Sequence, residues 1–358
     1  MSDVVRFGPY DLVRPIGEGG MAQVYLAERR RPATFEVPRV VLKVVRQELL
    51  SDDVVVGMFL EEGRLLARLR HPNVVQVIQV DVLNDIPYLV MEYVHGPTLY
   101  QIRRRVGRPD EASLGRLLRI VASACEGLHH AHTADLGTGA HGVVHRDVSL
   151  QNILVSAESG TTKLIDFGIA KAPDSEWDTD HGLLRGKLSY LAPELIYGAS
   201  ATAASDVFAV GVIVHWLVLG RMPYASTVPL EQRARALPSS LPGVPEDLAH
   251  ILRSAMAAEP EARPTADELS RALHDAATDR ACPPHAIQSF VKTVFPRGEE
   301  DWQHLVRPVA EHGTLARLAS AYARTKRLWR LAIVAIIAAL LAVLVVGLTA
   351  LGFIVATP

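Results

Sequence analysis

The feature that most constrains this 358-residue chain is the order of several short polar motifs, each beside an apolar run. The central pair is HRDVSLQN (145–152) and LIDFG (164–168). Asp147 could accept the proton of a substrate hydroxyl, and Asn152 could hold a metal ion. Asp166 follows a β-type apolar run, from which a carboxylate can reach Mg²⁺. Each motif alone could be a turn or a surface segment, so their order and spacing carry the argument.

A glycine-rich stretch, GEGGMAQV (17–24), precedes these motifs. Gly17 and Gly19 allow a tight turn that brings backbone amides close to phosphate oxygens. The same spacing occurs in dinucleotide-binding Rossmann folds, but there a helix follows the glycines directly. Here QVYLAE (23–28) reads as a strand, which favours a phosphate-covering hairpin.

Lys43 lies in the apolar strand pattern VVLKVV, where a lysine needs an anionic partner. ATP phosphates and a carboxylate would supply two, and Glu62 in the next helical pattern is the candidate carboxylate. The alternative is an edge-strand lysine whose ammonium reaches solvent along its own apolar stem. On this residue alone, the edge-strand interpretation is the better one.

Periodicity divides the chain into a β-rich part and a helical part. Residues 10–100 contain glycine-broken and turn-bounded apolar runs typical of strands, with one helical pattern that ends before HPN (71–73). From about residue 97 helical patterns dominate, including 112–132, 205–220 and 245–256. The folded part is expected to end near Ala276, before a proline-containing linker.

With YLAPE (190–194) and EARPTADEL (261–269) added, the motif order resembles the eukaryotic-type (Hanks-type) protein kinases, specifically the bacterial membrane-anchored Ser/Thr branch. The resemblance spans about residues 8–275. It implies an α+β, bilobal protein kinase fold with a β-rich N-lobe and a helical C-lobe. The implied domains are a kinase domain at 8–276 (N-lobe about 8–96, C-lobe about 97–276), a juxtamembrane linker at 277–330 and a transmembrane helix at 331–355.

The resemblance also implies a role for each site residue. Asp147 would be the catalytic base, Lys43 would contact the α- and β-phosphates and pair with Glu62, and Asn152 and Asp166 would bind Mg²⁺, which Mn²⁺ could replace. His145 and Phe167 would belong to an internal packing spine, Asp206 would brace the catalytic loop, and Glu194 would pair with Arg263. The residues expected to bind ATP are Ile16, Gly17, Glu18, Gly19, Gly20, Met21, Ala22, Gln23, Val24, Lys43, Met91, Glu92, Tyr93, Val94 and Leu154.

Three residues depart from the pattern of the family. Ser149 stands where these kinases usually carry a lysine, Leu150 replaces a proline, and Lys187 stands where a threonine is usual. We expect that Lys187 supplies, from the opposite wall of the site, the charge that a lysine at 149 would bring. The alternative is a solvated loop lysine in a slow enzyme.

The expected function is an ATP-dependent protein kinase that transfers the γ-phosphate to Ser/Thr hydroxyls of protein substrates, including itself, in membrane-linked signalling. Ser175 and Thr179, between Asp166 and Glu194, are the expected phosphoacceptors. One alternative is a pseudokinase scaffold that binds nucleotide or partners without transfer. Small-molecule phosphotransferases, a second alternative, generally lack the Glu194 and Arg263 equivalents.

Composition limits the remaining classes. The formal net charge is −2, so no basic surplus points to nucleic acid. Two distant cysteines, Cys125 and Cys282, predict neither a disulfide framework nor a metal cluster.

Residues 331–355 contain no charged side chain, and as a helix of about 37 Å they would cross a hydrocarbon core of about 30 Å. Arg324, Lys326, Arg327 and Arg330 precede this stretch. The positive-inside rule predicts a single-pass protein of the cytoplasmic (inner) membrane, with the kinase domain in the cytoplasm and the lipid bilayer as a partner. Small residues in the span make a homodimer a candidate assembly.

Overall fold

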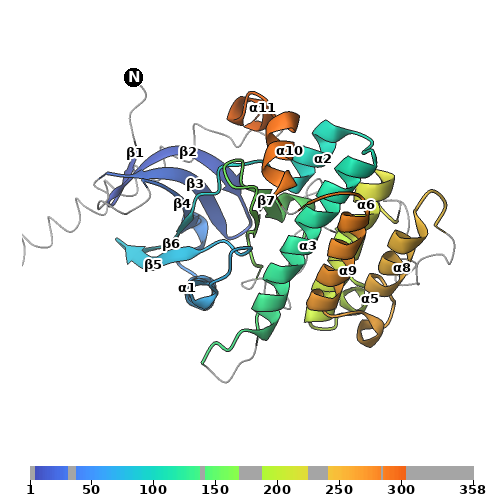
Figure 1. Ribbon diagram of the computed structural model, residues 1–358. Coiled ribbons are helices and arrows are strands. Elements are labelled where there is room, and N and C mark those ends of the chain that lie inside the picture. The colour runs from blue at the N-terminus through green and yellow to red at the C-terminus, as the bar shows by residue number, and fades with distance from the viewer. Residues whose placement is uncertain are drawn as a thin grey trace, which may run out of the picture. The chain divides into compact units, whose positions relative to one another are not determined.

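The computed structural model describes residues 5–30, 38–137, 142–168, 188–224, 241–283 and 285–303 (Figure 1). These residues form two compact units. Within the described ranges, the first unit runs up to Leu50 and includes the hairpin tip Asp81–Tyr88. The second unit comprises Ser51–Val80 and the chain from Leu89 onward.

A six-stranded sheet with the order β1-β2-β3-β4-β6-β5 contains the strands of the N-terminal part. The strands are antiparallel from β1 to β4, and Val24 of β3 lies opposite Lys43 of β4. In the first unit, the Phe7 ring meets the Tyr88 ring edge-on, with 5.1 Å between ring centroids. The strands are β1 (Val5–Phe7), β2 (Tyr10–Glu18), β3 (Ala22–Arg29), β4 (Arg39–Val45), β5 (Val77–Leu83) and β6 (Ile86–Glu92).

The strands β5 and β6 and the turn between them confirm the turn-bounded apolar runs predicted in this part of the sequence. Asn84 and Asp85 both have positive φ, at 48° and 64°. A two-residue hairpin turn of this kind matches the right-handed twist of its strands, and Asn and Asp tolerate the left-handed region best after glycine. The helical pattern before HPN is also confirmed, since α1 spans Asp53–Arg68 and is capped by the Asp52 carboxylate.

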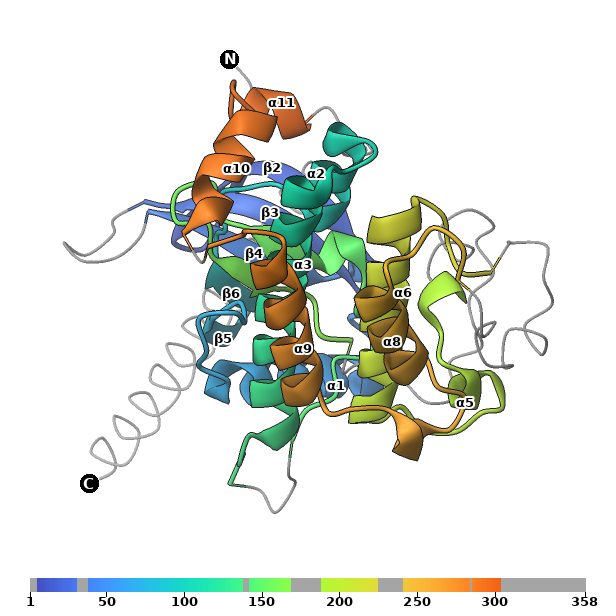
Figure 2. The same ribbon diagram turned by 45° about the vertical axis from the view of Figure 1, so that its right-hand side comes forward.

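Helices dominate the second unit, as the sequence predicts. α3 and α9 pack along each other, and α6 packs against both α3 and α8 (Figures 1 and 2). The remaining helices are α2 (Leu99–Val106), α3 (Glu111–Thr133), α5 (Pro193–Ile196), α6 (Ala203–Leu219), α8 (Glu246–Ala255), α9 (Ala266–Asp279), α10 (Ala286–Val294) and α11 (Glu299–Gln303). Short 3₁₀ turns lie at Gln47–Leu49, Leu150–Asn152, Leu188–Tyr190 and Pro260–Ala262.

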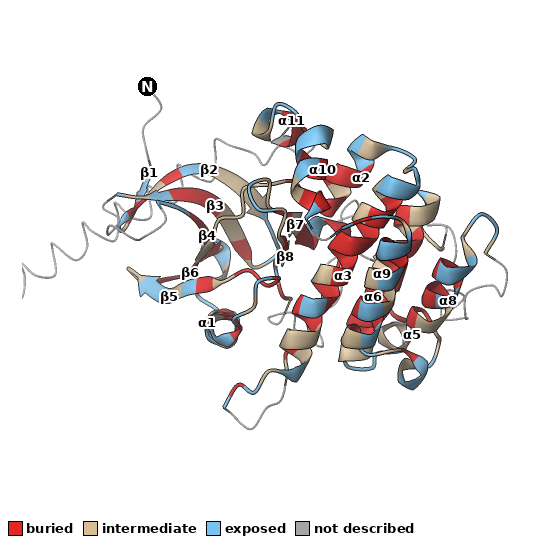
Figure 3. Ribbon diagram, viewed as in Figure 1, coloured by how far each residue is buried: buried red, intermediate tan, exposed pale blue. Residues whose placement is uncertain are grey.

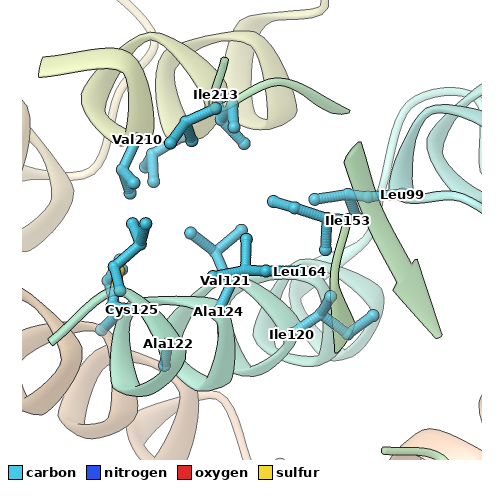
Figure 4. Close-up of a cluster of buried hydrophobic side chains, with 14 of the residues drawn as sticks. Leu99, Ile120, Val121, Ala122, Ala124, Cys125, Ile153, Leu164, Val210 and Ile213 are labelled. Carbon is cyan, nitrogen blue, oxygen red and sulfur yellow. The ribbon is translucent and has the colours of Figure 1, made fainter. Parts of the chain in front are cut away.

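The core of the second unit lies between α3 and α6. Figure 4 shows Val210 and Ile213 of α6 facing Val121 and Cys125 of α3. α6 is buried almost all round over Ser205–His215, which explains its nearly continuous apolar sequence (Figure 3). Strands β7 (Ile153–Val155) and β8 (Thr162–Leu164) form a two-stranded ladder whose side chains Ile153 and Leu164 join the same core.

The folded structure continues beyond Ala276, where the sequence predicts the end of the kinase domain and the start of a linker. α9 extends to Asp279, and α10 and α11 follow, with Phe290 and Trp302 buried. The described part of the expected linker is therefore a packed part of the second unit.

The expected membrane span 331–355 lies outside the described residues. Within the described residues, no helix combines the length and apolar character needed to cross a bilayer.

Candidate active site

The loop 145–152 is held by one buried carboxylate from α6. Asp206 accepts hydrogen bonds from the backbone amides of His145 (2.7 Å) and Arg146 (2.9 Å), and His132 lies 2.8 Å from the same carboxylate. Arg146 adopts a left-handed backbone with φ of 61°. A left-handed backbone costs free energy in a non-glycine residue, so the hydrogen bonds to Asp206 help to stabilise this turn. The expected bracing role of Asp206 is confirmed.

His145 forms the floor of this loop. Its ring stacks on the Phe167 ring with 4.2 Å between centroids, as expected for two packing residues. Its Nδ1 accepts from the Asp147 amide (3.3 Å) and its Nε2 lies 3.1 Å from the Ile165 carbonyl. Burial lowers the pKa of His145, although the carboxylates of Asp206, Asp147 and Asp166 act in the opposite direction. A neutral ring that accepts at Nδ1 and donates at Nε2 satisfies both contacts.

Asn152 connects the two expected functional aspartates. Its Nδ2 donates to the Asp147 backbone carbonyl (2.8 Å) and to the Asp147 carboxylate (3.1 Å). Its backbone carbonyl accepts from the amide of Ile165, the residue before Asp166 (3.0 Å). The structure thus brings Asp147, Asn152 and the neighbourhood of Asp166 into one hydrogen-bonded cluster.

Asp166 is presented by an irregular turn directly after β8. Its φ is 58°, and the amide of Gly168 donates to the His145 carbonyl (2.8 Å). β8 is itself fixed by Asn73, whose side chain donates to the Thr162 carbonyl (2.9 Å) and whose carbonyl accepts from the Leu164 amide (2.8 Å). Non-glycine residues with a left-handed backbone are strained, and they persist only where the surrounding structure holds them. Such residues cluster at functional sites.

The donor set fits a hard divalent cation. The Asp166 carboxylate and the Asn152 side-chain carbonyl are oxygen ligands of the kind that Mg²⁺ takes, and the Asn152 nitrogen is turned toward Asp147. In the described part of the chain, no three His, Cys, Asp or Glu side chains form a metal site by themselves. Mg²⁺ is commonly bound by one or two protein groups plus phosphate oxygens, and Asp166 and Asn152 would be the protein groups here.

The expected hinge begins at the end of β6. The Glu92 carboxylate accepts from the Gln76 amide (2.8 Å) and lies 2.6 Å from the Lys163 ammonium on β8. Its side chain is therefore used within the protein, and so is its backbone amide, which donates to the Gln76 carbonyl (3.0 Å). Leu154 lies in β7, and Thr98 bridges to it.

The glycine-rich stretch forms the β2–β3 hairpin of the first unit. Gly17 pairs with Val24, Glu18 pairs with Gln23, and the Gly19 amide donates to the Ala22 carbonyl (2.9 Å). A strand follows the glycines, so the Rossmann alternative is excluded. Lys43 lies opposite Val24, which places both on neighbouring strands. In the second unit, Glu62 lies on α1 and is only 3% exposed.

Glu194 and Arg263 form the buried ion pair that the sequence predicts. The Arg263 guanidinium donates two bonds to the Glu194 carboxylate (2.8 and 2.7 Å), and its side chain is 0% exposed. Ser205 donates to the same carboxylate (2.7 Å). Burial by itself raises the pKa of Glu194, but the hydrogen bonds from Arg263 and Ser205 outweigh it and lower that pKa.

The sequence did not indicate the roles of two residues that support the site. Lys163 reads as an ordinary strand lysine, and His132 reads as one of several scattered histidines. A charged residue in the short strand beside LIDFG was a usable signal for Lys163, but its partner lies 71 residues away. Ser149 and Leu150 are both buried, and Leu150 joins the hydrophobic core. Lys187, Ser175 and Thr179 lie outside the described residues.

Comparison with known proteins gives one consistent match. The family model described as "Protein kinase domain" matches residues 10–273. The chain is 35% identical over 329 residues to the tyrosine-protein kinase MasK of Myxococcus xanthus, covering 88% of this chain and 50% of that one. It is 34% identical over 277 residues to the probable serine/threonine-protein kinase PknB of Lactococcus lactis (75% and 42%) and 34% identical over 262 residues to the serine/threonine-protein kinase PrkC of Bacillus subtilis (71% and 38%).

Solved structures agree with the fold. The crystal structure of the PknI kinase domain of Mycobacterium tuberculosis matches with a TM-score of 0.57 at 25% identity, covering 78% of this chain and 99% of that one. A point mutant of the same domain matches at 26% identity with a TM-score of 0.54, covering 79% and 99%. The chain spans half or less of the length of the curated relatives named above.

Proposed function

The chain belongs to the protein kinase family, and we propose on that premise that it is an ATP-dependent kinase transferring the γ-phosphate to serine and threonine hydroxyls of protein substrates. The observation that carries the proposal is the position of Asn152. Its amide nitrogen holds the Asp147 carboxylate, and its backbone is bonded to the residue before Asp166. The residues proposed as base and metal ligands therefore belong to one hydrogen-bonded cluster, which supports a site for phosphoryl transfer.

In this proposal each residue has a separate task. Asp147 accepts the proton of the attacking hydroxyl, and its hydrogen bond from Asn152 fixes the carboxylate for that step. Asn152 and Asp166 hold Mg²⁺, which neutralises phosphate charge. Lys43 contacts phosphate oxygens, the β2–β3 hairpin covers them, and the backbone at Met91–Val94 binds adenine. Asp206 keeps the loop rigid, because it fixes two successive amides.

The test is direct. Purified full-length protein is incubated with γ-labelled ATP and magnesium, and the labelled residues are identified by phosphoamino acid analysis. Asp147→Asn is the matched control, because it keeps the shape of the side chain and removes the base. We expect it to lower the transfer rate by about 10²–10⁴-fold while ATP still binds. Wild-type protein that binds ATP and transfers no label at all would favour the pseudokinase scaffold.

Tyrosine phosphorylation is the second candidate. Two observations favour it: Ser149 replaces the lysine usual in the Ser/Thr branch, and the relative MasK is named a tyrosine-protein kinase. The serine/threonine assignment rests on the names of relatives such as PknB and PrkC and on the family resemblance. The same phosphoamino acid analysis separates the two, because phosphoserine, phosphothreonine and phosphotyrosine are resolved from one another after partial acid hydrolysis.

We also propose that the protein is anchored in the cytoplasmic membrane by residues 331–355, with the kinase domain in the cytoplasm. The support is the uncharged stretch and the basic residues before it. Deletion of 328–358 is expected to move the protein from the membrane fraction to the soluble fraction. Full-length protein that fractionates as soluble would contradict the anchor.

Autophosphorylation at Ser175 and Thr179 is part of the proposal, with Arg146 as a cation that a phosphate could recruit. Mass spectrometry of the wild type and of Asp147→Asn tests it. We expect phosphate at one or both residues in the wild type and at neither in the variant. A homodimer would assist transfer between molecules.

A further inference from the structure

Residues 286–303, which we call the C-terminal cap, lie beyond the family match at 10–273. α10 packs against α2 and α3, and both views show it beside α2 (Figures 1 and 2). The Arg116 guanidinium of α3 lies over the Phe290 ring, 5.5 Å from its centroid. The buried apolar residues of the cap are Ala286, Ile287, Phe290, Val291, Phe295 and Trp302.

The cap reaches the residue that follows the expected hinge. The His95 ring lies 5.4 Å from the Trp302 ring, and its Nε2 lies 3.5 Å from the Glu299 carboxylate. The His95 ring also lies 6.1 Å from the Tyr93 ring. Ring contacts therefore lead from Trp302 of the cap through His95 to Tyr93 in the hinge segment 91–94.

Gln101 ties the backbone of the cap to the same region. Its Nε2 donates to the Trp302 carbonyl (2.9 Å), and this bond is buried. Its Oε1 accepts from the amide of Thr98 (2.7 Å), the residue that caps α2. One side chain thus joins Trp302 to the first turn after the hinge.

The backbone of the segment 95–97 is fixed by the β7–β8 hairpin. The Ala157 amide donates to the His95 carbonyl, and the Val155 amide donates to the Pro97 carbonyl, both at 2.9 Å. Gly96 lies so close to this hairpin that a Cβ there would collide with the Val155 carbonyl. The hairpin therefore holds the backbone of the segment, and the His95 ring contacts both the cap and the hairpin, since its Nδ1 lies 3.8 Å from the Glu158 carboxylate.

We propose that Trp302 is a positioning residue for nucleotide binding, which acts through His95 to hold the backbone at Tyr93–Val94 in the conformation that binds adenine. The inference rests on the proposed function, because it assigns a task to the ATP site. A hinge that is already ordered loses less conformational entropy when the ligand binds, so the cap raises the affinity for ATP. The competing explanation is that the cap only covers apolar surface on α2 and α3.

A double-mutant cycle in the full-length chain separates these explanations. Trp302→Ala and His95→Ala are each expected to raise the KM for ATP by about fivefold or more, with kcat at saturating ATP nearly unchanged. The double variant is expected to be no worse than the more damaging single variant, because both changes break one connection. KM values that stay at the wild-type level, or effects that simply multiply, would overturn the proposal.

Ile251→Ala is the matched control for general loss of stability. Ile251 is a buried residue of α8, which packs against α6 and α9 rather than against the cap. A similar fall in melting temperature with an unchanged KM for ATP is expected from it. If Ile251→Ala raises the KM as much as Trp302→Ala does, the effect is general loosening and the positioning role is wrong.

Hydrogen exchange in the absence of nucleotide provides a readout that does not depend on kinase activity. Both His95→Ala and Trp302→Ala are expected to speed amide exchange over residues 91–96 and to leave α8 unchanged. Unchanged exchange at 91–96 contradicts the inference. If the wild type binds no ATP but the variants still exchange faster over residues 91–96, the connection from Trp302 to the hinge segment is supported. The proposed function is then wrong.

Discussion

The Lys163 ammonium lies 2.6 Å from the Glu92 carboxylate, so that β8 and the end of β6 are joined by an ion pair. Glu92 also accepts from the Gln76 amide, and Lys163 also lies 3.4 Å from the Val74 carbonyl. β8 leads in two residues to Asp166, and β6 leads into the expected hinge. One pair therefore ties the segment that would bind adenine to the segment that would bind the metal.

Lys163→Met tests this pair, because methionine keeps most of the length and removes the charge. We expect the free energy of unfolding to fall by about 1–2 kcal/mol, since a charge-assisted bond is lost from a partly buried site. Urea denaturation measures it. The exchange Glu92→Lys with Lys163→Glu should recover part of the loss, and a Lys163→Met protein as stable as the wild type would show that the pair contributes nothing.

Arg263→Met should be far more damaging than the loss of an exposed ion pair. Removing the guanidinium leaves the Glu194 carboxylate with only Ser205 of its three donated bonds, and breaking a buried pair costs about 3–5 kcal/mol. Arg271→Met is the control, because Arg271 and its partner Asp267 are exposed. For Arg271→Met we expect the free energy of unfolding to fall by about 0–1 kcal/mol. Equal losses in the two variants would contradict the role of the buried pair.

The same carboxylate predicts how stability depends on pH. Because the pKa of Glu194 is lower in the folded protein than its ordinary value, its contribution is fully present above the unfolded pKa. The contribution is lost as the pH falls below about 4, through the folded pKa. Unfolding curves from pH 7 to pH 3 should therefore fall less steeply for Glu194→Gln than for the wild type, and parallel curves would argue against it.

Asp206→Asn should slow catalysis, although Asp206 is expected to hold the loop 145–152 and not to contact substrate. The amide keeps one acceptor for the amides of His145 and Arg146 but turns an NH₂ group toward the other. We expect a fall in kcat of about tenfold or more and a loss of stability of about 1–3 kcal/mol. Steady-state kinetics and calorimetry measure the two effects. A variant with wild-type kcat would mean that the left-handed turn at Arg146 keeps its conformation without both hydrogen bonds to residue 206.

Lys187→Ala tests the expected exchange of charge between the two walls of the site. If Lys187 supplies the cation that Ser149 does not, kcat should fall by about 10²–10³-fold with little change in ATP affinity. Ser149→Lys combined with Lys187→Thr should recover part of this loss. If Lys187→Ala leaves kcat unchanged, the exchange is wrong, and Ser149 is tolerated for another reason.

Local signals were sufficient wherever a motif and its partner lie close in sequence. Asp147 and Asn152 lie on one short loop, and the Asn84–Asp85 turn follows from the tolerance of those residues for positive φ. The pair formed by Glu194 and Arg263, 69 residues apart, could be expected only through the resemblance to a family. Glu92 and Lys163 lie 71 residues apart, and no local sequence pattern around either residue indicates the other as its partner.

The sequence by itself determined the order of elements, the β-rich and helical parts, and the candidate residues Asp147, Asn152 and Asp166. Those features depend on periodicity and on short-range spacing. Only the tertiary structure decided the fate of residues 286–303, which read as a proline-containing linker. α10 and α11 have nine and five residues, too short to be stable helices alone. They form because Phe290 and Trp302 are buried against helices that lie more than 150 residues earlier in the chain.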